Sequence, residues 1–107
     1  MKRIPFRDRG TFKAREVITA MVENPPPMQG ITYADMRKRD RILDALDKQK
    51  GERFLDLEDS DYAVLRGILD TFQFATAKRE LRLILDDIAN AVAPEDTPQL
   101  KLVEDGA

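Results

Sequence analysis

The chain has 107 residues, of which 42% are hydrophobic and 36% are charged, and its formal net charge is −2. It contains neither cysteine nor histidine, which excludes disulfide frameworks, thiolate nucleophiles, most transition-metal sites and most hydrolytic triads. A chain of this length forms one domain with a single modest core. No stretch approaches the ~20 apolar residues that span a bilayer, and the basic start lacks the apolar run of a signal peptide. We therefore expect a cytoplasmic protein.

Residues 1–10 predict an extended, basic arm. Pro5 and Gly10 interrupt any helix, and apolar residues alternate with charged ones. The arm is expected either to lie as an edge strand or to dock on another chain. Beyond it, residues 11–93 predict a helical domain, and residues 94–107 predict a flexible acidic tail.

The helical domain begins with a helix that we predict over residues 11–24. Thr11 is placed to cap the first turn, and Asn24 ends the helix because a residue before proline avoids the helical region. Pro25–Pro27 follow as a polyproline II run. We interpret this run as a rigid spacer rather than a docking motif, since docking normally needs a PxxP context.

The second predicted helix runs from Thr32 to the turn at Gly51 and has sequence signals at both ends. Thr32 is the N-cap with Asp35 three residues later, as in a capping box, and Gly51 takes the position after the helix. The charged block at residues 37–41 makes the first half of this helix poorly suited to a core. Residues 54–57 then predict a short extended piece, which is either a strand paired with the arm or a packed loop.

The third and fourth helices are predicted over residues 58–72 and 76–92. Gly67 lies inside the third helix, and because glycine in a helix costs up to ~1 kcal/mol relative to alanine, we expect a close packing contact there. Thr76 is placed to cap the fourth helix, which has the clearest amphipathic stripe in the chain. Leu83 lies off this stripe and is a candidate partner contact. The whole pattern predicts a mainly α protein, a small bundle of about four helices with an extended N-terminal arm and room for a minor two-stranded ribbon.

Charge is unevenly distributed along the chain. Residues 1–15 carry six cationic side chains against one carboxylate, and residues 86–107 carry six carboxylates against one lysine. Such a layout can steer a partner or a neighbouring copy, although two solvated tails would give the same pattern. Within the acidic tail, Leu100 and Leu102 are candidate partner contacts, because a short apolar stretch can add as a strand to a partner.

The sequence predicts no catalytic, cofactor or metal site. The acidic cluster at residues 56–61 lacks the glycine and closing glutamate of an EF-hand loop, so we interpret it as turn and helix-start charges. Asp86 and Asp87 are adjacent and therefore point in different directions around a helix. The five scattered glycines form no phosphate-binding loop. We therefore predict a protein that is not an enzyme, with no catalytic residue, no cofactor and no metal.

Basic residues are the strongest candidates for contact with a macromolecule. Those in the second helix occupy turns where a recognition helix places its reading residues, and those in the arm resemble arms that reach a groove or a phosphate backbone. The sequence pI of about 5.2 opposes nucleic-acid binding, since such domains are typically basic. The candidate contacts for a protein partner or a nucleic acid are Lys2, Arg3, Arg7, Arg9, Arg37, Lys38 and Arg41.

Three segments of residues 28–92, GITYADMRKRDRILDAL, FLDLEDSDYAVLRGIL and FATAKRELRLILDDI, resemble small accessory proteins encoded by tailed bacteriophages. In those proteins a helix start of the LEDxDYxxL type precedes a last amphipathic helix. The resemblance implies a role in virion assembly or host interaction, either in the host cytoplasm or in the virion. No functional residue carries over from it.

These observations lead to two hypotheses of function. The first is a non-enzymatic protein–protein interaction or assembly protein that self-associates, because opposed charges at the two ends favour head-to-tail or cyclic association. The second is a nucleic-acid-binding regulator that uses the basic arm and the second helix. We expect no membrane partner in either case.

Overall fold

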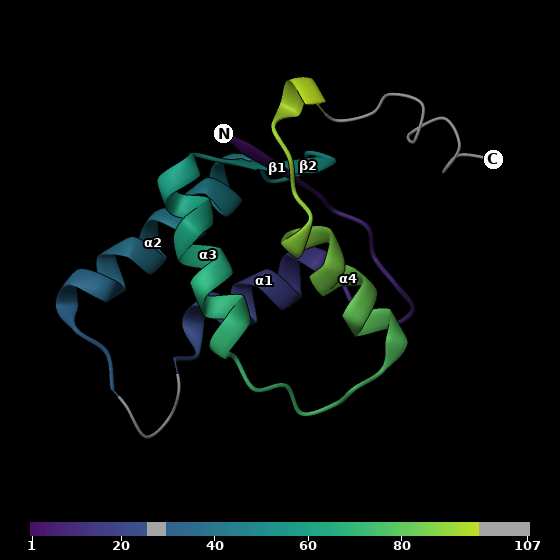
Figure 1. The fold of residues 1–107 in the computed structure, drawn as a ribbon, viewed down its shortest axis with the longest axis horizontal. Coiled ribbons are helices and arrows are strands. Elements are labelled where there is room, and N and C mark those ends of the chain that lie inside the picture. Colours follow the sequence, from purple (N-terminus) through teal and green to yellow (C-terminus); the bar gives the residue numbers. More distant parts are fainter. Residues whose placement is uncertain (26–29, 97–107) are drawn as a thin grey trace.

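The described part of the protein is mainly α-helical, with four helices and a two-stranded antiparallel sheet, which agrees with the fold class that the sequence predicts. The computed structural model describes residues 1–25 and 30–96. Figure 1 shows the small sheet across one end of the helices, with α3 between α2 and α4. In chain order the elements are β1 (Lys2–Pro5), α1 (Ala14–Glu23), α2 (Tyr33–Lys48), β2 (Phe54–Leu57), α3 (Asp59–Thr71), α4 (Arg79–Ala89) and a short 3-10 turn, η1 (Pro94–Asp96).

The first strand joins residues 1–10 to the helical body. β1 pairs antiparallel with β2, with Ile4 opposite Leu55 and Arg3 opposite Asp56. Successive strand residues point to opposite faces, so Ile4 and Leu55 are buried while Arg3 and Asp56 form an ion pair on the other face at 2.8 Å. The two-stranded ribbon that the sequence allows is therefore present.

A single hydrophobic core lies between the sheet and the helices. Both strands and all four helices contribute to it, at the spacing that the apolar stripes of the sequence predict. Each fully buried aliphatic side chain of this kind stabilises the fold by about 1.5–3 kcal/mol. The buried residues of the core are Ile4, Ile18, Met21, Val22, Ile42, Leu46, Leu55, Leu57, Leu65, Ile68 and Ile88.

The longest helix, α2, has two halves with different surroundings. Ile42 and Leu46 in its second half are buried in the core. Residues 33–38 in its first half are all exposed, and the charged block at residues 37–41 is exposed except for the half-buried Arg39, so this block lies outside the core as expected. α2 has 16 residues, and among the described residues no helix is long and apolar enough to cross a membrane.

The start of α2 follows its sequence signal, whereas the start of α1 does not. Thr32 Oγ1 accepts a hydrogen bond from the backbone N–H of Asp35 at 3.1 Å, which confirms Thr32 as the cap. The prediction that Thr11 caps the first helix is wrong. A turn closed by two backbone hydrogen bonds between Arg9 and Phe12, each 2.9 Å long, takes up this part of the chain instead.

Two expectations for α3 and α4 are also wrong. Thr76 does not cap α4, which begins three residues later at Arg79 with no side-chain cap bond. The preceding loop stays extended because Phe72 and Phe74 pack against the core. Gly67 makes no close packing contact with another element, since outside its own helix no atom of the described residues lies within 4 Å of the position that a Cβ would take there.

Candidate functional site

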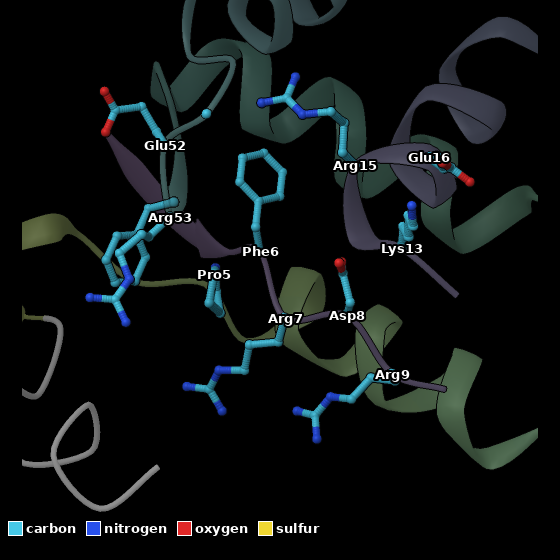
Figure 2. A pocket seen from close by; sticks show the side chains of 12 residues that line it. Pro5, Phe6, Arg7, Asp8, Arg9, Lys13, Arg15, Glu16, Glu52 and Arg53 are labelled. Carbon is cyan, nitrogen blue, oxygen red and sulfur yellow. The ribbon is translucent and has the colours of Figure 1, made fainter. Parts of the chain in front are cut away.

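A groove opens beside the N-terminal segment, between residues 5–16 and the turn at residues 51–54 that leads from α2 into β2. It has a volume of about 800 Å³, and Figure 2 shows the side chains of both segments around it. Five of its lining side chains are cationic and three are carboxylates, so the groove is electropositive. The lining residues are Pro5, Phe6, Arg7, Asp8, Arg9, Lys13, Arg15, Glu16, Gly51, Glu52, Arg53 and Phe54.

Phe6 and Arg15 lie together in this groove. The Arg15 guanidinium stands 4.8 Å from the centroid of the Phe6 ring, and Figure 2 shows the ring directed towards Arg15. Arg15 also donates to the carbonyl oxygens of Leu46 (2.5 Å) and Gln49 (3.0 Å) at the end of α2. Carbonyl groups at the end of a helix favour a cation, so Arg15 fixes α1 against α2.

Arg9 connects the groove to α4. Its guanidinium lies 3.6 Å from the carboxylate of Asp87, which is longer than a hydrogen bond. Arg9 Nε and Asp87 Oδ2 are buried, and neither has a hydrogen-bond partner among the described residues. Burial raises the pKa of the Asp87 carboxyl above its ordinary value, although the positive charges of Arg7 and Arg9 oppose this shift. The two arginines therefore place their charge close to one half-buried carboxyl group.

A tight turn at Gly10 sets the rim of the groove. Its φ of +59° is an angle that residues other than glycine rarely adopt, and a Cβ there would lie 3.3 Å from the side chain of Glu80. Before the turn, Asp8 Oδ1 accepts a hydrogen bond from the backbone N–H of Ala14 at 3.0 Å. Asp8 thus caps the start of α1, the role that the sequence predicts for Thr11. Lys13, the residue just before α1, is exposed at the rim of the groove.

Lys13 and Arg53 are the two exposed cations of the groove and come from its opposite walls. The carbonyl oxygen of Arg53 accepts a hydrogen bond from the backbone N–H of Phe6 at 2.9 Å, which holds this residue beside the N-terminal segment. In the described part of the chain, neither side chain forms an ion pair. Both charges are therefore available to a bound molecule.

A second, apolar pocket of about 260 Å³ adjoins the groove and shares Lys13 and Glu16 with it. It lies between α1 and the loop that joins α3 to α4. The rings of Phe72 and Phe74 in that loop have centroids 4.7 Å apart. Its lining residues are Thr11, Phe12, Lys13, Glu16, Val17, Ala20, Met21, Phe72, Phe74 and Leu81.

Several residues that the sequence singled out have structural partners away from the groove. Arg3 forms a two-bond ion pair with Asp56, at 2.8 and 2.9 Å. Arg41 forms another with Asp61 of α3, at 2.8 and 3.3 Å. Lys2 is half-exposed on β1. Asp56 and Asp61, two members of the acidic cluster, thus neutralise arginines.

Arg37 and Lys38 lie on the exposed first half of α2 and do not line the groove. The Arg37 guanidinium lies 5.8 Å from the centroid of the Tyr33 ring and donates to the Tyr33 hydroxyl at 3.1 Å. Tyr33 and Met36 are 71% and 51% exposed. The outer face of α2, defined by these four residues, is therefore a second exposed surface with mixed cationic and apolar character.

The structure places one of the three candidate partner leucines. Leu83 is half-buried on α4. Leu100 and Leu102 lie outside the described residues. The predicted leucine contacts thus remain predictions.

Sequence reasoning identified two of the five cations of the groove, Arg7 and Arg9, and missed the other three. Lys13 and Arg15 contribute to the high positive charge of residues 1–15, so the charge of this segment could have identified them as candidate contacts. Arg53 has no comparable signal, because only the pairing of β1 with β2 brings it to the groove.

Within residues 1–25 and 30–96, no group of three or more carboxylates is placed to hold a metal ion. The described residues form a basic groove with an apolar pocket at its rim. No protein-family model, no curated protein and no solved structure matches the chain.

Proposed function

We propose that the protein is a non-enzymatic protein–protein interaction protein whose basic groove binds an acidic segment of its partner. The observation that carries this proposal is the groove itself, where five cations from two distant segments gather around a volume of about 800 Å³. Charge complementarity of this kind speeds association and selects the partner. A role in assembly, in particular in the assembly of a virus, is part of the proposal and rests on the resemblance to phage accessory proteins.

An acidic protein segment fits the groove better than a nucleic acid does. Three carboxylates stand among its cations, and they repel a continuous phosphate backbone, whereas an acidic peptide can place its charges between them. The other predicted nucleic-acid contacts are dispersed, since Arg3 and Arg41 are held by carboxylates and Arg37 and Lys38 lie on α2. Binding of nucleic acid by these scattered residues is the second candidate function.

The test uses two double variants with the same change in charge. Lys13→Glu/Arg53→Glu alters the exposed cations of the groove, and Arg37→Glu/Lys38→Glu alters the outer face of α2. The probe is a labelled acidic peptide that contains leucines, and its binding to the wild type and to both variants is measured by fluorescence anisotropy at low salt. We expect the groove variant to bind about tenfold more weakly, which corresponds to about 1.4 kcal/mol from two rim charges, and the α2 variant to bind as the wild type does.

Three outcomes would contradict the proposal. In the first, the acidic peptide does not bind the wild type. In the second, the α2 variant loses binding while the groove variant keeps it. In the third, the protein binds duplex DNA or RNA with a strong salt dependence and does not bind the peptide. The last outcome would establish the second candidate. Circular dichroism checks that the variants are folded, and both pairs are exposed side chains whose replacement leaves the core intact.

A further inference from the structure

We infer that the acidic segment bound by this groove is residues 94–107 of a second copy of the chain, so that the protein self-associates head to tail. This inference rests on the proposed function and identifies the partner. It also uses the apolar pocket, which a purely acidic partner would leave empty.

The chemistry of residues 94–107 matches the groove and the pocket together. The segment carries Glu95, Asp96, Glu104 and Asp105 against one lysine. Its apolar residues are grouped next to the second pair of carboxylates, as Leu100, Leu102 and Val103. A partner for a basic groove with an apolar pocket at its rim needs both properties within a short length of chain.

The groove and the pocket are close enough for one short segment to use both. Lys13 and Glu16 line both of them, so the start of α1 is their common wall. An extended chain rises about 3.3 Å per residue, and Leu100 and Glu104 are therefore about 13 Å apart in that conformation. A leucine in the pocket thus leaves the following carboxylates within reach of the cations of the groove.

At Val92 the chain is directed away from the groove of its own copy. The backbone N–H of Arg3 donates to the Val92 carbonyl oxygen at 2.7 Å in an antiparallel bridge. The chain therefore runs from Val92 towards Lys2, whereas the groove begins at Pro5, at the other end of β1. A groove on one copy that takes a segment from the next makes a heterologous contact, which closes into a ring or continues as a filament.

The test uses full-length chains with complementary defects. The groove variant is Lys13→Glu/Arg53→Glu, the tail variant is Glu104→Lys/Asp105→Lys, and a third chain carries all four changes. The mass of each is measured by light scattering over a concentration series at low salt. We expect the wild type to exceed its monomer mass of 12.2 kDa as concentration rises, and both double variants to need about tenfold higher concentrations to do so.

Mixing the variants distinguishes a head-to-tail contact from any other mode of association. The groove variant keeps an intact tail and the tail variant keeps an intact groove, so an equimolar mixture should form a complex of twice the monomer mass. The chain with all four changes should associate again, because its reversed groove and reversed tail attract each other. Arg37→Glu/Lys38→Glu, with the same change in charge as the groove variant, should associate as the wild type does.

The inference is overturned if the wild type stays monomeric, if the groove variant associates at the same concentrations as the wild type, or if the mixture forms no complex. If the wild type is monomeric and the tail variant binds the acidic peptide more tightly than the wild type does, residues 94–107 occupy the groove of their own copy. In every case where the wild type is monomeric but binds the peptide, this inference fails while the proposed function stands. If the peptide does not bind at all, both fail.

Discussion

Single polar side chains tie the elements of this small protein together. Arg15 joins α1 to the end of α2, and Arg3 joins the two strands through Asp56. Tyr62 has a similar role between α3 and α4, because its hydroxyl donates to the carbonyl oxygen of Ile88 at 2.6 Å. Burial raises the pKa of this hydroxyl, so it remains a donor throughout the neutral range.

The first prediction at this scale is that Tyr62→Phe lowers the free energy of unfolding by about 0.5–1.5 kcal/mol. The ring is retained, so the loss measures the hydrogen bond that holds the last turn of α4 to α3. The matched control is Tyr33→Phe, which removes an exposed hydroxyl and should change stability by less than about 0.5 kcal/mol. Urea denaturation of the three proteins provides the comparison, and an equal effect of both substitutions would contradict this account of Tyr62.

Among the helices, α3 has a weak point that no packing contact explains. Gly67 is an exposed residue in the interior of α3, and open space surrounds the position that its Cβ would take. Glycine therefore costs helix stability at this position, and nothing in the described structure compensates for the cost.

For this element we predict that Gly67→Ala raises the free energy of unfolding by up to about 1 kcal/mol. Gly51→Ala provides a comparison of opposite sign, because Gly51 has a φ of +88°, at which a Cβ causes strain. Both substitutions meet open space, so the backbone angle alone distinguishes them. Thermal denaturation should show a higher midpoint for the first variant and a lower one for the second; a lower midpoint for Gly67→Ala would contradict this account of α3.

At the scale of the whole molecule, the contact between Arg9 and Asp87 closes the N-terminal segment against α4. Burial raises the pKa of Asp87 in the folded protein above its ordinary value of 3.8. At pH values between the pKa of Asp87 in the unfolded protein and its higher pKa in the folded protein, the folded state binds more protons than the unfolded state. The free energy of unfolding therefore falls as pH rises through this interval. Ionised Asp87 therefore destabilises the fold at neutral pH.

Asp87→Asn removes this titration while it keeps the shape of the side chain. We predict that the stability of the variant relative to the wild type is lowest below pH 3.8, rises as pH increases through the raised pKa of Asp87, and then becomes constant. Denaturant unfolding of both proteins at a series of pH values measures the difference. A difference that is independent of pH would show that the charges of Arg7 and Arg9 cancel the effect of burial on the pKa of Asp87, and one that falls with rising pH would show that they outweigh it; either result would contradict this prediction.

The candidate site was only partly predictable from the sequence. The high positive charge of the first fifteen residues indicated a binding surface, and Arg7 and Arg9 were identified within it. The second predicted basic surface, on α2, lies apart from the groove, because helix periodicity cannot show which exposed charges will share a surface. Arg41 was assigned to that surface, yet it is neutralised by Asp61 from another helix.

Interactions between near neighbours in the sequence decided the secondary structure of this protein. Tertiary contacts decided where some of its elements begin and which charged side chains gather on its surface. Apolar periodicity and the Thr32 cap depend on neighbours within one or two turns, so the sequence alone determined the four helices. It left residues 54–57 open between a strand paired with the arm and a packed loop. The cap of α1 and the charge cluster of the groove depend instead on residues across a turn or far apart in the chain. Asp8 replaces Thr11 at the start of α1, and Arg53 reaches the groove only because β2 pairs with β1. Those outcomes follow from three-dimensional packing, which periodicity in the sequence does not encode.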